Sequence, residues 1–248
     1  MKLSIITTVY NAEPYVQESL DSVFNQTFED FELIIVDDCS TDKTNEILQK
    51  YKNHPKVIFL ENEFNKGVSF SRNRALTVAK GEYIAIHDAD DISLPYRFEK
   101  EVKYLDNHSE ITVVGSHAFK IDINGKITGF MTYPPETTEN ARRVIKDFKL
   151  NPIIDSSSMF RKQTILDIGM YPEEKRFRTV QDFYLWCTLL AKGYKIHNFQ
   201  EPLIKYRDNP NGVTKKRHFE QRLSTDIVWE LFSNIFDKKG IEISFPNK

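Results

Sequence analysis

Three carboxylates follow one short apolar segment of the chain. Residues 83–86 are apolar, and Asp88, Asp90 and Asp91 occupy three of the next five positions. An apolar run of this length after Gly81 is typical of a buried strand, and open α/β sheets bind ligands at the carboxyl ends of their strands. Acids this close repel one another unless a cation or hydrogen-bond donors compensate them. The spacing therefore indicates a site for Mg²⁺ or Mn²⁺ beside a phosphate; an Asp-rich turn that caps the next helix is the alternative.

Strand and helix patterns alternate around this segment. Apolar runs predict three strands before it, and helical spacing predicts a helix after each of them; the strands are expected at 3–9, 31–36 and 57–60, and the helices at 15–24, 42–51 and 68–79. Alternation with short connections predicts an α/β fold with a doubly wound, mostly parallel sheet. Ligand-binding residues are then expected on the loops after the first, second and fourth strands.

The second half of the chain has a less regular pattern. We expect a soft boundary near Gly115, a hairpin that turns at Asn124-Gly125, and a mobile loop at 207–217. Further elements are predicted as helices at 96–105, 134–148, 162–168, 181–191 and 219–236, and as strands at 111–114 and 194–199.

Composition excludes several classes of protein. The 248 residues carry a formal net charge of -2, which gives no support to nucleic acid as a partner. Cys39 and Cys187 form no metal-binding pattern, so a reducing cytoplasm is expected. The first residues run directly into a strand without a signal peptide, and no apolar run is long enough to span a bilayer. The loop after the first strand lacks the glycines of a dinucleotide fold, and the chain has no phosphate-binding P-loop motif.

Several short motifs occur in one order along the chain. The main ones are Thr7-Thr8-Val9-Tyr10-Asn11, Val36-Asp37-Asp38-Cys39-Ser40-Thr41-Asp42, Asp88-Ala89-Asp90-Asp91 and Gln181-Asp182; supporting ones are Asn65-Lys66-Gly67, Ser71-Arg72-Asn73, Met159-Phe160-Arg161-Lys162, Ile168-Gly169 and Lys205-Tyr206-Arg207. In this order and spacing the chain resembles a family 2 glycosyltransferase of the GT-A fold over roughly residues 1–210. The resemblance implies a GT-A domain at 1–215, with a nucleotide-sugar half at 1–115 and an acceptor half at 116–215. Residues 216–248 would be a C-terminal helical extension.

The resemblance also implies how the donor is bound. Asp38 matches the residue that hydrogen-bonds a pyrimidine base, although capping of the next helix is the alternative. On the neighbouring loop, Thr8 lies near the donor, Tyr10 stacks on the base and Glu13 bonds base or ribose. For Tyr10 the alternative is packing in the core.

Four further residues are expected around the phosphates and the sugar. Arg72 would reach the diphosphate or orient Asp88, unless it lies on a solvated helix face. Asp88, with Ala89 beside it, matches the position that contacts ribose or sugar. Asp90 matches the metal ligand that shares Mn²⁺ or Mg²⁺ with the donor diphosphate. For the neighbouring Asp91 we favour a helix cap.

Asp182 is the expected general base. An acceptor hydroxyl is a poor nucleophile until its proton is removed, and a carboxylate at a helix start can take that proton. A first-turn acid that only stabilises the helix dipole is the alternative. Two departures from the family pattern stand out: Gln181 precedes the base where Glu or Thr is usual, and Asp155-Ser156-Ser157-Ser158 replaces a common His-Pro-Ser. The second departure concerns a segment that borders the acceptor.

The resemblance implies inverting, metal-dependent transfer of a sugar from a nucleotide sugar, expected to be UDP-linked. The expected acceptor is a glycan or lipid-linked glycan in cell-surface polysaccharide synthesis. A magnesium-dependent nucleotidyl or phosphoryl transferase and a non-catalytic sugar-nucleotide-binding module are the alternatives. The loop at 207–217 would close over the donor. The apolar stripe of the last helix, Leu223, Ile227, Leu231 and Ile235, favours packing on the domain or a homodimer. The protein is then expected in the cytoplasm, with at most peripheral contact to the inner membrane face.

Overall fold

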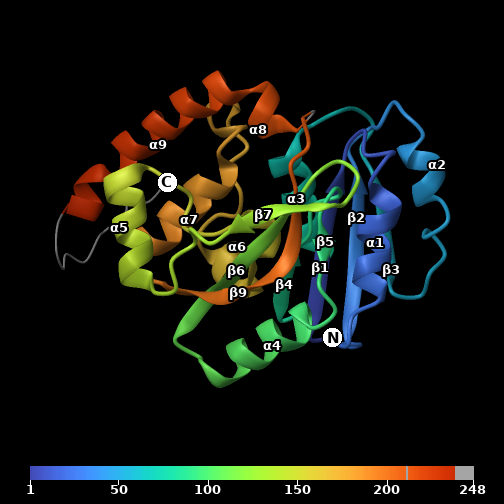
Figure 1. Cartoon of the computed structure of the whole chain (residues 1–248), viewed down its shortest axis with the longest axis horizontal. Helices are drawn as coiled ribbons and strands as arrows, with labels where there is room; N and C mark the ends of the chain where they lie inside the picture. The colour runs from blue at the N-terminus through green and yellow to red at the C-terminus, as the bar shows by residue number, and fades with distance from the viewer. Residues whose placement is uncertain (211, 238–248) are drawn as a thin grey trace.

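The computed structural model describes residues 1–210 and 212–237. Its first half is a parallel sheet of four strands in the order β3-β2-β1-β4. The strands are β1 (Leu3–Val9), β2 (Phe31–Asp37), β3 (Val57–Glu61) and β4 (Tyr83–Ile86). Leu3 lies opposite Phe31 on one side and Tyr83 on the other, so all carboxyl ends meet at one edge. The predicted strands and their direction are confirmed (Figure 1).

The side chains of these strands alternate between the two faces of the sheet, and both faces are buried. Leu3, Ile5 and Ile35 pack in one cluster, whereas Ile6 and Ile34 pack in the other. This alternation follows from the two-residue period of a strand, and full burial on both faces explains why the runs are continuously apolar. The first face is covered by α1 (Val16–Phe24), α2 (Thr44–Leu48) and α4 (Arg97–Asn107). The second is covered by α3 (Val68–Val78) and by helices from the second half.

The sheet continues into the second half without interruption. After β4 the order is β8-β6-β9-β5, with β7 paired to β6, which makes nine strands in one sheet among the described residues. The strands are β5 (Ile92–Ser93), β6 (Ile111–Ile121), β7 (Ile127–Met131), β8 (Met159–Arg161) and β9 (Lys195–Arg207). Only the β6–β9 pair is parallel here. The α/β prediction is confirmed, and the parallel character is strongest in the first half.

Strand β6 joins the two halves at Gly115. A Cβ atom at this position would lie 2.5 Å from Asn198 Oδ1 and 2.7 Å from Ile153 Cγ2, so only glycine lets the three segments approach. β6 is therefore one strand of eleven residues where the sequence suggested a break.

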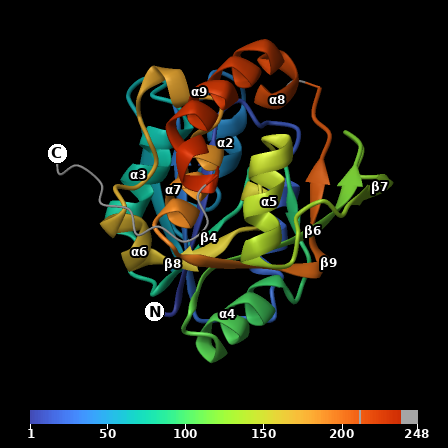
Figure 2. The same cartoon turned by 90° about the vertical axis from the view of Figure 1, so that its left-hand side faces the viewer.

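Several helices cover the second half, as Figure 2 shows. They are α5 (Thr138–Phe148), α6 (Lys162–Asp167), α7 (Gln181–Ala191) and α9 (His218–Asp237). On α9 the side chains of Val228 and Phe232 are buried against the domain, whereas Leu223 and Leu231 are about half exposed. The helix thus packs on the domain through one side of its apolar surface. The possible homodimer remains a prediction. No helix in the described parts of the chain is long and apolar enough to cross a bilayer.

The prediction of a mobile loop at 207–217 is wrong at its start and at its end. Arg207 ends β9 and is only 3 % exposed, and a short helix, α8 (Val213–Lys216), occupies the last part of the segment. A buried arginine at this point was not apparent from sequence, because the groups that compensate its charge come from distant parts of the chain.

Candidate active site

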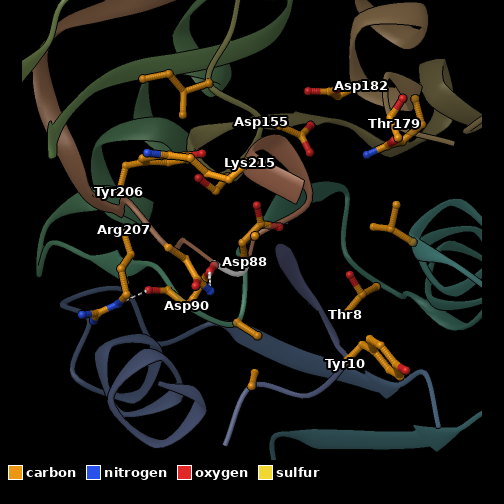
Figure 3. Close-up of a pocket in the computed structure, with 18 of the residues that line it drawn as sticks. Thr8, Tyr10, Asp88, Asp90, Asp155, Thr179, Asp182, Tyr206, Arg207 and Lys215 are labelled. Atoms are coloured by element: carbon orange, nitrogen blue, oxygen red, sulfur yellow. Dashed lines mark hydrogen bonds between the residues drawn. The ribbon is translucent and has the colours of Figure 1, made fainter. Parts of the chain in front are cut away.

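One cavity of about 750 Å³ opens at the carboxyl ends of β1, β2 and β4. This size is within the usual range for ligand sites, and the position is the one expected for an open α/β sheet. Figure 3 shows side chains from both halves of the chain pointing into it. The cavity is lined by eight of the nine predicted site residues: Thr8, Tyr10, Asp38, Arg72, Asp88, Ala89, Asp90 and Asp182.

Glu13 is the predicted donor residue that does not line the cavity. Its carboxylate accepts a hydrogen bond from the backbone N–H of Lys43 (Oε2 to N, 3.3 Å), and its own N–H donates to Asp42. These contacts join the loops after β1 and β2. A role for Glu13 at the base or ribose stays a prediction.

Asp38 is buried and holds the turn before α3. Its Oδ1 accepts from Asn62 Nδ2 (2.7 Å) and from the Lys66 N–H (2.8 Å), and its Oδ2 accepts from the Gly67 N–H (2.8 Å). Oδ2 thus keeps one lone pair for a further donor such as a ring N–H of a base. The helix-cap alternative is wrong for α2, because the bonds of Asp38 reach forward to α3.

Tyr10 is 49 % exposed at the rim of the cavity. Core packing, the alternative interpretation, is therefore wrong for this residue. An exposed ring beside the buried carboxylate of Asp38 offers a flat apolar surface on which a base can stack.

Arg72 is buried under the floor of the cavity and pairs with two acids. Its Nη2 lies 3.0 Å from Asp88 Oδ1 and its Nη1 lies 2.5 Å from Asp155 Oδ2. The guanidinium also sits over the ring of Tyr171, with 5.1 Å from its carbon to the ring centroid. The solvated-face alternative is wrong, and Arg72 fixes the direction of Asp88, which was one of its two predicted roles.

Asp90 faces the cavity and is held from one side. Its Oδ2 accepts from Asn209 Nδ2 (3.0 Å), while its backbone carbonyl accepts from Arg207 Nε (2.8 Å), as drawn in Figure 3. Burial is the main cause that raises the pKa of Asp90 above its usual value, and the charge of Asp88 raises it further. A carboxylate in this state gains from an added cation.

Asp91 is turned away from the cavity and is not a helix cap. Its Oδ1 accepts from the backbone N–H of Arg207 (2.8 Å), and α4 begins only at Arg97. Asp91 therefore anchors the acidic turn to the end of β9. Burial and the neighbouring Asp90 and Asp88 raise its pKa well above the usual range.

Asp182 lies in the first turn of α7 and lines the far side of the cavity. Its Oδ2 accepts from Asn151 Nδ2 (2.5 Å). Phe183 and Trp186, on the same helix, are buried. Burial raises the pKa of Asp182, and the N–H of Phe183 and the charge of Arg72 oppose this rise. In Figure 3 Asp182 and Asp90 lie on opposite sides of the cavity, with Asp88 and Asp155 between them.

Sequence reasoning missed four residues around this cavity. Arg207 donates from its guanidinium to the carbonyls of Asp90, Asp122 and Ile123, and to Glu18 Oε2. Asn209, Asn151 and Lys215 also line the cavity. Arg207 lies in a recognised motif, and Asn209 and Lys215 lie in the loop at 207–217 that was expected to close over the donor, but none of the three was given a role of its own. Asn151 had no signal, because its place depends on a contact with the distant Asp182.

The chain is similar to known proteins in sequence and in structure. The family model for "Glycosyl transferase family 2" matches residues 4–169. An uncharacterized glycosyltransferase, MJ1057 of Methanocaldococcus jannaschii, is 39 % identical over 92 % of this chain and 79 % of its own. A UDP-Glc:alpha-D-GlcNAc-diphosphoundecaprenol beta-1,3-glucosyltransferase of Escherichia coli, WfaP, is 28 % identical over 88 % of this chain and 82 % of its own.

Among solved structures, residues 1–349 of TarS from S. aureus in complex with UDP are similar to this chain. The TM-score is 0.68 at 25 % identity, and the match covers 94 % of this chain and 71 % of the other. This likeness confirms the GT-A fold.

Proposed function

The chain belongs to glycosyl transferase family 2, and from this premise we propose that it moves a sugar from a UDP-sugar to a hydroxyl of a lipid-linked glycan. The observation that carries the proposal is the convergence of Asp38, Asp90 and Asp182 on one cavity. The donor and acceptor names of the E. coli relative, and the UDP in the TarS complex, support the choice of substrates.

In the proposed complex the nucleotide lies along β1 and β2. Tyr10 stacks on the base, Asp38 accepts from a ring N–H, and Thr8 lies beside them. The diphosphate then extends toward the acidic turn after β4, where Asp88, oriented by Arg72, reaches the ribose or the sugar.

A divalent cation fits this turn by the chemistry of its oxygen donors. Asp90 would hold it together with oxygens of the diphosphate, because no group of three acidic, histidine or cysteine side chains gathers for a metal within residues 1–210 and 212–237. Burial raises the pKa of Asp90, and a cation beside it would stabilise its ionised form. When bound, Mn²⁺ or Mg²⁺ supplies charge stabilisation to the departing nucleoside diphosphate.

Asp182 acts as the general base in this proposal. It takes the proton of the acceptor hydroxyl while that oxygen attacks the anomeric carbon. The hydrogen bond from Asn151 aims the carboxylate and favours its ionised form. Because Asp182 and Asp90 lie on opposite sides of the cavity, attack and departure occur on opposite faces of the sugar, and the configuration inverts.

The lipid-linked acceptor places the protein at a membrane surface, with peripheral contact on the cytoplasmic face. The product would be a step in the assembly of a cell-surface polysaccharide. Nucleotidyl transfer has no observation in its favour, since the loop after β1 lacks the glycines and arginines that this chemistry needs.

The test is an assay of nucleoside diphosphate release from UDP-sugars, with a GlcNAc-diphospholipid as acceptor and Mn²⁺ present. Acceptor-dependent release of UDP is the expected result. Release of pyrophosphate, or donor binding without turnover under any condition, would overturn the proposal.

A further inference from the structure

Asp155 is an acid in the middle of the cavity that the proposed chemistry does not yet use. It begins a single 3₁₀ turn, η1 (Asp155–Ser157), just before β8. The turn is held by its own contacts: the Asp155 carbonyl accepts from the N–H (2.9 Å) and from Oγ (2.7 Å) of Ser158. The side chain of Asp155 therefore projects from a fixed piece of backbone.

The carboxylate of Asp155 is only partly satisfied. Its side chain is 11 % exposed, and Oδ2 is paired with Arg72 Nη1. Its Oδ1 is buried and has no hydrogen-bond partner, so a hydroxyl in the cavity would reach the carboxylate at Oδ2, which keeps a lone pair beside Arg72. The hydroxyl of Tyr171, buried beneath the same guanidinium, makes no hydrogen bond either and so does not supply the missing donor.

The carboxylates around Arg72 together hold more negative charge than its single positive charge can compensate. One guanidinium serves both Asp88 and Asp155, and the charge of Asp182 acts on Asp155 from the other side. Burial is the largest cause that raises the pKa of Asp155 to about 7, and Asp182 and Asp88 add to it. A carboxylate in this situation gains strongly from a hydroxyl donor, because hydrogen bonds to an ionised acceptor are among the strong ones.

The location of Asp155 identifies the kind of hydroxyl. Figure 3 places it between Asp88, on the donor side, and Asp182, the proposed base. A sugar that reaches both of these acids has to pass Asp155. A buried polar group of the protein also distinguishes strongly between substrates, because a substrate that lacks the matching hydroxyl leaves this group without a hydrogen-bond partner.

We propose that Asp155 accepts a hydrogen bond from one hydroxyl of a sugar bound between Asp88 and Asp182, and thereby selects the sugar by the position of that hydroxyl. This proposal rests on the proposed glycosyltransferase function. The hydroxyl belongs either to the transferred sugar or to the acceptor sugar, and the chemistry is the same in both cases.

The first experiment uses the unaltered protein with Mn²⁺. UDP-glucose, UDP-galactose and UDP-GlcNAc are screened for turnover with a GlcNAc-diphospholipid, and UDP alone is measured for binding. If none of the sugars is transferred, the proposed function fails and Asp155 is not in question. With an active pair in hand, single deoxy analogues of the donor sugar and of the acceptor sugar are compared.

The second experiment adds Asp155→Asn, with Asp167→Asn as the matched control, because Asp167 does not line the cavity and its carboxylate accepts a hydrogen bond from Gln163. We expect one deoxy analogue to lose about 10- to 100-fold in kcat/KM with the unaltered protein. With Asp155→Asn that loss shrinks to within about threefold, while the affinity for UDP stays close to that of the control. Sensitivity to a donor analogue assigns the hydroxyl to the transferred sugar, and sensitivity to an acceptor analogue assigns it to the acceptor.

Two results would overturn the proposal. In the first, every deoxy analogue loses the same factor with Asp155→Asn as with the unaltered protein. In the second, the variant weakens UDP and UDP-sugar equally, which would make Asp155 a support for Arg72 alone. If no deoxy analogue loses activity with the unaltered protein, the proposal also fails, and this result needs no variant, so the proposal can be overturned even if Asp155→Asn folds poorly.

Discussion

Asn151 donates a hydrogen bond to the carboxylate of Asp182 over 2.5 Å, and so ties the segment before η1 to the first turn of α7. The bond fixes the direction of the carboxylate that we assign as the base. It also opposes the effect of burial on its pKa.

Replacement of Asp182 by Asn should abolish most of the transfer. Loss of a positioned general base typically costs about 10²- to 10⁴-fold in rate. We expect kcat to fall by this amount while the affinity for UDP stays unchanged, as measured by UDP release and by calorimetry. Asp147→Asn, an exposed acid that pairs with Arg143, is the control. An Asp182→Asn variant with kcat within threefold of the unaltered protein would show that another group removes the proton.

The rate of transfer should rise with pH through the pKa of Asp182. A base is active when ionised, and burial raises this pKa above 3.8, so activity is lost at a higher pH than for an ordinary aspartate. We expect kcat at saturating substrate to increase with pH to a plateau, with a midpoint above that of an ordinary aspartate. Asn151→Ala, which removes a bond that favours the ionised form, should move the midpoint upward. A midpoint that stays in place, or moves downward, would contradict the role of this hydrogen bond.

Replacement of Asp90 by Ala should remove the response to divalent cations. With the unaltered protein, chelation by EDTA should lower the transfer at least tenfold, and Mn²⁺ should restore it. In Asp90→Ala the transfer should be slow both with EDTA and with Mn²⁺. Addition of Mn²⁺ should also raise the affinity for UDP less than it does in the unaltered protein. Full metal-dependent transfer by Asp90→Ala would contradict the assignment of Asp90 as the ligand.

Tyr10 should contribute to nucleotide affinity through its ring. Stacking of a base on an aromatic side chain is worth about 1–3 kcal/mol, so Tyr10→Ala should weaken UDP binding by roughly 5- to 150-fold. Tyr10→Phe should keep most of the affinity. Phe64→Ala is the control, because Phe64 is 54 % exposed and does not line the cavity. Equal affinities of the Ala and Phe variants would argue against stacking.

Arg207 should be essential for stability. Its buried guanidinium donates to three carbonyls and to Glu18, which is itself 56 % exposed. Hydrogen bonds that involve a charged group contribute about 1.5–3 kcal/mol each, so loss of the guanidinium should cost on the order of 3–5 kcal/mol. Arg207→Ala should lower the Tm by roughly 6–20 °C. Arg207→Lys should recover little, since an ammonium cannot reproduce the planar fork. Arg176→Ala, an exposed arginine paired with Glu174, should shift the Tm by less than about 2 °C.

The sequence predicted those elements that are determined by residues close together in the chain. The strands of the first half were predicted because their runs of apolar residues are continuous, and α7 because its pattern ends at a glycine. The long β6–β9 pair was predicted only in pieces. Gly115 and Pro202 interrupt its apolar runs, and the register of this pair shifts near His117. Such irregular pairing depends on contacts across the molecule, which a periodicity does not reveal.

The same reason separates the predicted site residues from the missed ones. Asp38, Asp90 and Asp182 lie within short motifs, so their neighbours in sequence identify them. Asn151 and Asn209 owe their place in the cavity to partners 31 and 119 positions away. Arg207 was recognised as part of a motif, but its burial was not, because a charged residue is buried only where distant groups compensate it.

The close approach of β6 to its neighbours at Gly115 also restricts how this protein can change. The acidic turn and the proposed base are both attached to one continuous sheet, so an insertion near Gly115 would displace both substrates together. New acceptor preferences are more accessible through substitutions at the rim, such as the segment around Tyr133 or the start of α9. Anyone who redesigns the protein for another linkage should begin there and leave the strands untouched.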